Sequence, residues 1–97
     1  MPKAYWIVHV NVSDPETYNQ YRAAIAAPLS EFGARFVVRG GTQEVREGEA
    51  KSRTVVIEFP SLVAAKACYD SAQYQAAKAI RDSASEGDFM IVEGYDG

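Results

Sequence analysis

Four stretches of the chain carry the apolar pattern of β-strands. Residues 4–12 alternate between a wholly apolar set and a mixed set, which predicts a half-buried strand. Residues 35–39 and 88–95 are rich in β-branched and aromatic side chains and predict two more strands. Residues 53–61 have apolar side chains on both faces and include Pro60, which cannot extend a sheet ladder. They therefore predict a central strand that leads directly into a helix.

The stretch between the first two strands has the spacing of an amphipathic helix. Asp14 is a good N-cap, Pro15 suits the first helical position, and Gly33 suits the left-handed residue after the C-terminus. Apolar side chains recur every three or four positions, at Tyr18, Tyr21, Ile25, Leu29 and Phe32. Pro28 lacks the N–H that would bond Ala24. We expect a kink there rather than an end, because the stripe stays in phase.

A second helical pattern follows the central strand, with Ser61 as its N-cap. We expect a bend or split near Asp70, because Ser71 can cap a second segment. Gly87 is predicted to end this helix. Residues 42–52 are polar, so the second and third strands should form a hairpin with a long tip.

The order of these elements is β-α-β-β-α-β, which predicts a ferredoxin-like unit of the α+β class. With right-handed crossovers, the first and third strands take the middle of a four-stranded antiparallel sheet, and both helices lie on one face. A chain of 97 residues supports a single domain, residues 1–97, with one modest core.

This arrangement leaves one face of the sheet without helices, although the central strand is apolar on both faces. The pattern leaves open whether the helices cover the side of Val55, Ile57 and Phe59 or the side of Val56. Soluble monomers rarely expose large apolar patches, so we expect a second copy to cover the open face and form a homodimer. Such an interface would bury on the order of 1,200–2,000 Å² or more in total.

Charge and cysteine content narrow the function classes. The formal charge of −3 comes from 13 acidic and 10 basic residues spread along the chain, which argues against nucleic-acid binding. Cys68 is the only cysteine, so neither an intramolecular disulfide nor a cysteine cluster for a metal is expected. We find no membrane-length apolar run and no signal peptide, and we therefore expect a cytoplasmic protein.

Several short motifs together resemble a known bacterial family. They are Arg39-Gly40-Gly41, Glu47-Gly48, Glu58-Phe59-Pro60-Ser61, Tyr69-Asp70-Ser71 with Tyr74, Arg81 and Glu93-Gly94. Over residues 5–94 the chain resembles the domain of unknown function 1330 family, within the dimeric α/β-barrel superfamily. The resemblance implies a ferredoxin-like protomer and a sheet-to-sheet dimer. That superfamily includes cofactor-independent monooxygenases, isomerases and haem-degrading enzymes.

Three positions depart from the pattern of many relatives. Gly33-Ala34-Arg35 stands where many have Gly-Gly-Arg, a change that need only alter a turn. Cys68 stands before Tyr69 where many relatives have tryptophan, and Ala72 follows Ser71 where many have proline. The pocket that the resemblance implies therefore need not keep the same shape.

Two charged residues on the strands are candidate site residues. Arg39 lies beside two glycines that would let a ligand approach closely, which fits an anion-binding arginine; alternatively, it pairs with Glu47 or Glu58. Glu58 lies among apolar residues. It either has a raised pKa and serves as a catalytic general base, or it forms a salt bridge to Arg39, Arg53 or Arg81.

A second candidate group surrounds the bend of the second helix and contains Tyr69, Ser71, Tyr74 and Arg81. These side chains would converge on a cleft between helix and sheet, with Tyr69 as a catalytic hydroxyl and the other three binding substrate. Alternatively, Ser71 only caps the helix, the tyrosines are core residues with polar tips, and Arg81 pairs with a surface acid.

His9 is the only histidine and could act as an acid or base near neutral pH, although a lone histidine is more often structural. Haem binding through His9 has no other support, so we predict no cofactor and no metal. Trp6 and Cys68 are expected in the core.

These observations leave two functions open. One is a small cofactor-independent enzyme of monooxygenase or isomerase type, which holds an organic substrate between sheet and helices near Arg39, Tyr69, Tyr74 and Arg81. The other is a non-catalytic homodimer that binds a small anionic metabolite. A ferredoxin-like RNA-binding domain is disfavoured, because the third strand lacks the aromatic pattern of such domains and the charge has the wrong sign.

Overall fold

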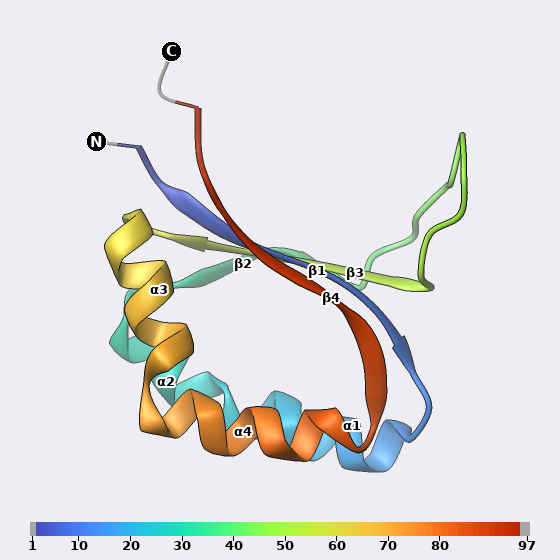
Figure 1. The fold of residues 1–97 in the computed structure, drawn as a ribbon, viewed down its shortest axis with the longest axis horizontal. Coiled ribbons are helices and arrows are strands. Elements are labelled where there is room, and N and C mark those ends of the chain that lie inside the picture. Colours follow the sequence, from blue (N-terminus) through green and yellow to red (C-terminus); the bar gives the residue numbers. More distant parts are fainter. Residues whose placement is uncertain (1, 96–97) are drawn as a thin grey trace.

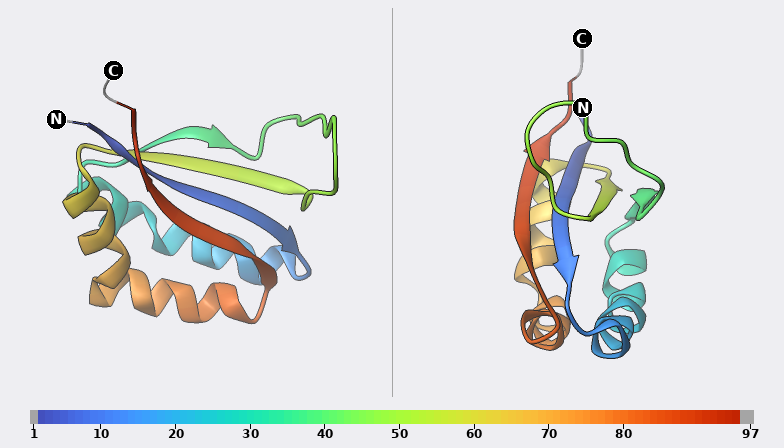
Figure 2. Two further views of the ribbon diagram at one scale, coloured as in Figure 1. Left: turned by 45° about the horizontal axis from the view of Figure 1, so that its top comes forward. Right: turned by 90° about the vertical axis from the view of Figure 1, so that its right-hand side faces the viewer.

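The computed structural model describes residues 2–95 and has the predicted order of elements (Figure 1). The antiparallel sheet contains β1 (Ala4–Val12), β2 (Arg35–Arg39), β3 (Arg53–Phe59) and β4 (Ser85–Glu93), in the spatial order β2-β3-β1-β4. The helices are α1 (Pro15–Ala24), α2 (Ala26–Glu31), α3 (Leu62–Asp70) and α4 (Ala72–Asp82). All of them lie on one face of the sheet (Figure 2). The predicted ferredoxin-like α+β fold is confirmed.

Both helical regions are interrupted, as the sequence indicated. Asp14 caps α1 by accepting from the Thr17 amide, and the helix breaks at Ile25, just before Pro28. The stripe stays buried across the break, through Tyr18, Tyr21, Ile25 and Leu29. Ser71 separates α3 from α4 and caps α4 by accepting from the Tyr74 amide. The local chemistry of proline and serine therefore sets both breaks.

The end of the second helical region differs from the prediction. α4 ends at Asp82, and Gly87 lies inside β4 instead of ending the helix. The strand starts earlier than expected because Ser85 already pairs with Val12. A Cβ at Gly87 would clash with the carbonyl oxygen of His9, so the glycine is required where β4 lies close against β1.

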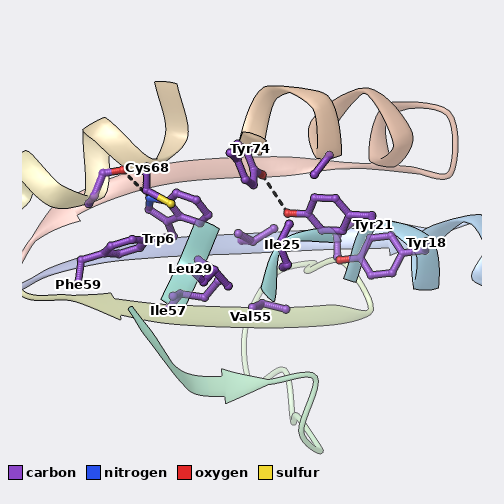
Figure 3. Packing of buried hydrophobic residues seen from close by; sticks show 14 of the residues in the cluster. Trp6, Tyr18, Tyr21, Ile25, Leu29, Val55, Ile57, Phe59, Cys68 and Tyr74 are labelled. Atoms are coloured by element: carbon purple, nitrogen blue, oxygen red, sulfur yellow. Dashed lines mark hydrogen bonds between the residues drawn. The ribbon is translucent and has the colours of Figure 1, made fainter. Parts of the chain in front are cut away.

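The core lies between the sheet and the helices. The side of Val55, Ile57 and Phe59 faces the helices, which settles the orientation that the sequence left open. Trp6 is fully buried, with its ring 4.8 Å from that of Phe59, and its indole N–H donates to the Ala65 carbonyl (Figure 3). The expected core position of Trp6 is confirmed.

Cys68 is also part of this core. Its side chain is buried, and burial raises the pKa of the thiol to about 11. The thiol therefore stays protonated and unreactive at neutral pH, as expected of a core cysteine.

No helix covers the opposite, outer face of the sheet in the described residues. The strand register places Val38, Val56, Ile7 and Met90 in one row across the four strands. Val38 and Met90 at the two ends of the row are 38% and 48% exposed. An apolar row on an uncovered face is typical of a surface that meets another chain.

The connection between β2 and β3 projects beyond the sheet, as expected for a hairpin with a long tip (Figure 1). Residues 40–50 of this connection are exposed, and Gly48 takes a left-handed conformation in the bend, with φ of +74°. None of the helices within residues 2–95 is long and apolar enough to cross a membrane.

Candidate functional site

A pocket opens between the sheet and α1. Its apolar lining comes from all four strands, α1 and the residue after it, and consists of Trp6, Val8, Tyr18, Tyr21, Ile25, Phe36, Val55, Ile57 and Phe89. Several of these side chains gather in Figure 3. The space open to the centre of a water-sized molecule is about 20 Å³, enough for roughly one water, and the whole hollow, including solvent at its mouth, spans about 380 Å³. A ligand can therefore bind at the mouth of this aromatic pocket. A ligand ring can enter the pocket more deeply only if the lining side chains move.

Three arginines line the same pocket. Arg22 comes from α1, Arg39 from the end of β2 and Arg53 from the start of β3. The Arg39 guanidinium lies 4.2 Å from the centre of the Phe36 ring, and the Arg53 guanidinium lies 5.9 Å from the centre of the Tyr18 ring. Aromatic side chains of the pocket thus help to position two of the three cations.

These three arginines have no acidic partner in the described part of the chain. Within residues 2–95, no carboxylate lies at ion-pair distance from Arg22, Arg39 or Arg53. The Nε atoms of Arg22 and Arg53 are buried and have no hydrogen-bond partner among these residues. A buried donor left unsatisfied costs about 1–3 kcal/mol, and arginine cannot lose its charge in a protein. The pocket therefore gathers positive charge in a protein whose net charge is −3.

Gly40 explains part of the glycine motif after Arg39. It has φ of +68°, and a Cβ at this position would clash with the guanidinium of Arg53. The sequence indicated that a glycine here would permit close approach. The group that approaches is the Arg53 side chain, which Gly40 allows to lie against the backbone.

A hydroxyl pair adjoins the aromatic pocket. The Tyr21 and Tyr74 hydroxyl oxygens are 2.9 Å apart, and Arg81 Nη1 donates to Tyr74 Oη at 3.4 Å (Figure 3 shows the tyrosine pair). Burial raises the pKa of both hydroxyls, so both stay protonated at neutral pH. If Tyr74 accepts from Arg81 and donates to Tyr21, the O–H of Tyr21 is left to donate to a bound group.

The structure brings together only part of the predicted cluster at the helix bend. Tyr74 and Arg81 contact each other, and the Tyr69 ring lies 5.3 Å from the Tyr74 ring within the aromatic core. Ser71 caps α4 and donates to the Cys68 carbonyl. Tyr69, Ser71 and Tyr74 are not among the residues that line the aromatic pocket.

Arg39 and Arg81 therefore do not share a site. Arg81 lines a separate open hollow beside β4 and pairs with Asp82 at 3.3 Å, which agrees with the alternative of a surface acid as its partner. Arg39 has neither of the partners suggested for it, Glu47 or Glu58, among the described ion pairs. The aromatic pocket contains Arg39 but not Tyr69, Tyr74 or Arg81, so it differs from the predicted pocket that would contain all four.

Glu58 points to the outer face of the sheet, away from the aromatic pocket. Its carboxylate accepts from Arg35 Nε at 2.7 Å and from the Tyr5 hydroxyl at 3.3 Å, and it lies 3.5 Å from Lys3 Nζ. The hydrogen bond from Arg35 lowers the pKa of Glu58 below its ordinary value. Of the two alternatives that the sequence left open, the raised pKa is wrong and the salt bridge holds, with Arg35 as a partner that the sequence did not single out.

His9 also lies on the outer face. The register places it between Thr54 on β3 and Asp88 on β4, and it lines a polar hollow with Lys51. Lys51 pairs with Asp88 at 2.8 Å. No group of His, Cys, Asp or Glu in the described part of the chain could hold a metal ion. The two proposed acid–base residues of the strands, His9 and Glu58, are therefore separated from the aromatic pocket by the sheet.

Sequence reasoning missed Tyr21, Arg22 and Arg53 as site residues. Tyr21 was interpreted only as part of the buried helical stripe, and Arg22 follows it directly. A usable signal existed for Arg53, which shares the alternation of Val55 and Ile57 and so belongs on the helix-facing side of β3. A charged residue in phase with a buried apolar set is a reason to look for a pocket.

Comparison with known families gives one clear match. The family described as Domain of unknown function (DUF1330) matches residues 3–95. No curated protein sequence matches the chain significantly.

Solved structures with a similar fold cover almost the whole chain. A protein of unknown function from Rhodopseudomonas palustris has a TM-score of 0.81 and 15% identity, over 99% of this chain and 85% of that one. SnoaB, a cofactor-independent oxygenase from Streptomyces nogalater, has a TM-score of 0.66 and 11% identity, over 100% and 97%. A dimeric protein of unknown function with a ferredoxin-like fold, from Bacteroides fragilis, has a TM-score of 0.62 and 17% identity, over 94% and 95%. At these identities the likeness shows the fold alone.

Proposed function

The chain belongs to the DUF1330 family, and we propose that it works as a homodimer that binds a small ring-containing organic molecule in the aromatic pocket and converts it without a cofactor. The observation that carries the proposal is the pocket itself. Its aromatic walls can bury a ring against other rings, which is the usual basis of affinity in small-molecule sites.

The hydroxyl of Tyr21 supplies the chemistry in this proposal. A reaction without a cofactor needs a substrate that carries its own reactive electrons, such as a quinol or an enolisable ketone. Loss of a proton from such a substrate to water at the mouth of the pocket places negative charge on an oxygen, and a protonated Tyr21 can donate a hydrogen bond to that oxygen. Tyr74 and Arg81 keep Tyr21 oriented through their hydrogen bonds. The similar fold of a cofactor-independent oxygenase supports this reading.

The homodimer in this proposal forms through the outer face of the sheet. Its support is the uncovered apolar row of Val38, Val56, Ile7 and Met90. A protein of similar fold is described as dimeric, which agrees with this assembly.

The proposal is tested by screening quinols, lactones and keto acids for turnover, followed by oxygen consumption and by mass spectrometry of the products. For a substrate found in this way, Tyr21→Phe should lower kcat by about 100-fold, the order expected for loss of one donor to a developing oxyanion. The matched control is Tyr95→Phe, because Tyr95 is 97% exposed, and it should leave kcat unchanged. Equal turnover by Tyr21→Phe and the wild type would show that this hydroxyl has no part in the reaction.

A specific observation favours a second function, a non-catalytic dimer that binds a small molecule. Among the described residues that line the pocket, none is Asp, Glu, His or Cys, so no general base stands beside the ligand. A binding protein would show ligand-dependent thermal stabilisation, since a ligand that binds only the folded state raises stability by mass action. Stabilisation by panel compounds without any turnover would select this function.

A further inference from the structure

We infer that the ligand of the aromatic pocket is an organic anion, whose carboxylate is bound by Arg22, Arg39 and Arg53 while its ring lies against Tyr18 and Phe36. The inference rests on the proposed function only in placing a ligand in this pocket.

The charge of the pocket indicates an anionic ligand. On the rest of the described surface, several basic side chains form ion pairs with nearby acids, as Arg35 does with Glu58 and Lys51 with Asp88. The three arginines of the pocket come from three different elements, converge on one hollow, and have no carboxylate of the described chain at ion-pair distance. An anionic ligand supplies the charge that the chain itself does not.

Unsatisfied hydrogen-bond donors in the pocket also indicate an anionic ligand. The Nε–H groups of Arg22 and Arg53 are buried donors without an acceptor among residues 2–95. Buried polar groups in folded proteins are almost always satisfied, so an orphaned pair in one pocket marks a place where an acceptor binds. A carboxylate offers two oxygens with about four lone-pair sites, which suits the planar fork of a guanidinium.

Neighbouring groups in the pocket hold two of its arginines in position. Arg39 lies on the Phe36 ring, and Arg53 lies near the Tyr18 ring and against Gly40. Side chains held in this way lose less freedom when they bind a ligand, which raises affinity. The rings beneath them offer an apolar surface next to the charge, so the site matches a molecule with an apolar body and an acidic end.

This assignment also bears on reactivity. Nearby positive charge favours the ionised form of an acid and lowers the pKa of a bound enol or phenol. While they bind the carboxylate, the arginines would also favour ionisation of an enol or phenol elsewhere on the same substrate, and its proton would pass to water at the mouth of the pocket, because the described lining contains no carboxylate base.

The test compares two probes of nearly the same shape, 1-naphthoate and the neutral 1-naphthamide, by isothermal titration calorimetry. The proteins are the wild type, Arg22→Gln, Arg39→Gln and Arg39→Lys, with folding checked by circular dichroism. The matched control is Arg46→Gln, because Arg46 is exposed in the β2–β3 connection and pairs with Glu44. 1-Naphthyl phosphate and inorganic phosphate are titrated as well, to separate a preference for carboxylate from a general preference for oxyanions.

We expect the wild type and Arg46→Gln to bind 1-naphthoate at least about 10-fold more tightly than 1-naphthamide, the order of one charge-assisted hydrogen bond. In Arg22→Gln and Arg39→Gln this preference should fall to within about 2-fold, and Arg39→Lys should recover part of it. Tighter binding of 1-naphthyl phosphate, or of inorganic phosphate alone, would overturn the assignment of a carboxylate.

Equal binding of both naphthalene probes by the wild type would overturn the inference and leave the pocket as a binding site for neutral molecules. A preference for 1-naphthoate that survives both glutamine substitutions would place the anion elsewhere and overturn it too. Arginine-dependent binding without turnover of any panel compound would uphold the inference and contradict the catalytic proposal. Failure of both probes to bind the wild type would contradict both.

Discussion

Basic residues on the two sides of the sheet differ in whether other residues of the described chain pair with them. On the outer face, Arg35 donates to Glu58 at 2.7 Å and Lys51 pairs with Asp88 at 2.8 Å, so charge is matched within the chain. On the inner face, Arg22 and Arg53 line the aromatic pocket with buried Nε–H groups that have no acceptor. Exposed ion pairs add about 0–1 kcal/mol each, whereas unpaired buried donors cost stability.

The difference separates residues that serve the fold from residues that serve a ligand. The salt bridge between Arg35 and Glu58 needs no ligand, because both partners belong to the chain. Arg22 and Arg53 have no acidic partner among residues 2–95, and natural proteins keep such costs mainly where function needs them. By this criterion the ligand site that we propose belongs on the inner face, whereas the ion pairs of the outer face serve the fold.

The largest effect is expected for dimer formation, from a substitution on the outer face of the sheet. Ile7→Glu places a charge in the middle of the apolar row, which a partner sheet would have to bury, and so should abolish the homodimer. Sedimentation equilibrium at micromolar concentration should give twice the 10.6 kDa chain mass for the wild type and 10.6 kDa for the variant. Val63→Glu is the control, because Val63 is 77% exposed on α3, and it should remain a dimer. A wild type that sediments only at 10.6 kDa, or a variant that stays dimeric, would refute this assembly.

At the inner arginines we expect a smaller effect on stability, and a substitution there should not destabilise the protein. Arg22→Gln removes a buried donor that has no acceptor, so the free energy of unfolding should be unchanged or should rise by up to about 1 kcal/mol. Urea denaturation without ligand measures this change. Arg35→Gln is the comparison and should lower stability slightly, because it leaves Glu58 without its closest partner. A loss of more than about 1 kcal/mol in Arg22→Gln would mean that this arginine serves the fold.

The smallest effect concerns pH. The folded-state pKa of Glu58 lies below its ordinary value of 4.5, mainly because of the hydrogen bond from Arg35. Its contribution to stability is therefore fully present above about pH 4.5 and is lost as the pH falls through the lower folded-state pKa. Thermal melts of the wild type and Glu58→Gln between pH 3 and 7 should converge at the acid end. A difference that stays constant over this range would show that the ion pair is not its source.

The sequence predicted most of the fold because the signals were local. Alternation in residues 4–12, the cap at Asp14 and the break at Ser71 depend only on near neighbours. The prediction that Gly87 ends a helix was wrong because a sequence does not distinguish such a glycine from one that permits two strands to lie close together. The single domain and the cytoplasmic location stay predictions.

The site was harder to predict because it depends on register and on contacts between distant segments. Arg35 faces Glu58 only through the pairing of β2 with β3, which shifts between Phe36 and Val38. No local pattern fixes that shift. In the same way, Arg22 and Arg53 meet in one pocket only after α1 packs under the sheet. The sequence predicted Arg39 as a site residue because two glycines follow it directly. It did not predict Arg22 and Arg53, the other arginines of the pocket, because they are distant in the sequence.

The most direct measurement follows the arginine Nε–H resonances by nuclear magnetic resonance during titration with 1-naphthoate. Arg35, whose Nε already donates to Glu58 on the outer face, is the internal control. The account predicts saturable shifts at Arg22 and Arg53, with one dissociation constant, and no shift at Arg35. Binding that shifts Arg35 while Arg22 and Arg53 stay unchanged would contradict the assignment of the inner face as the ligand site.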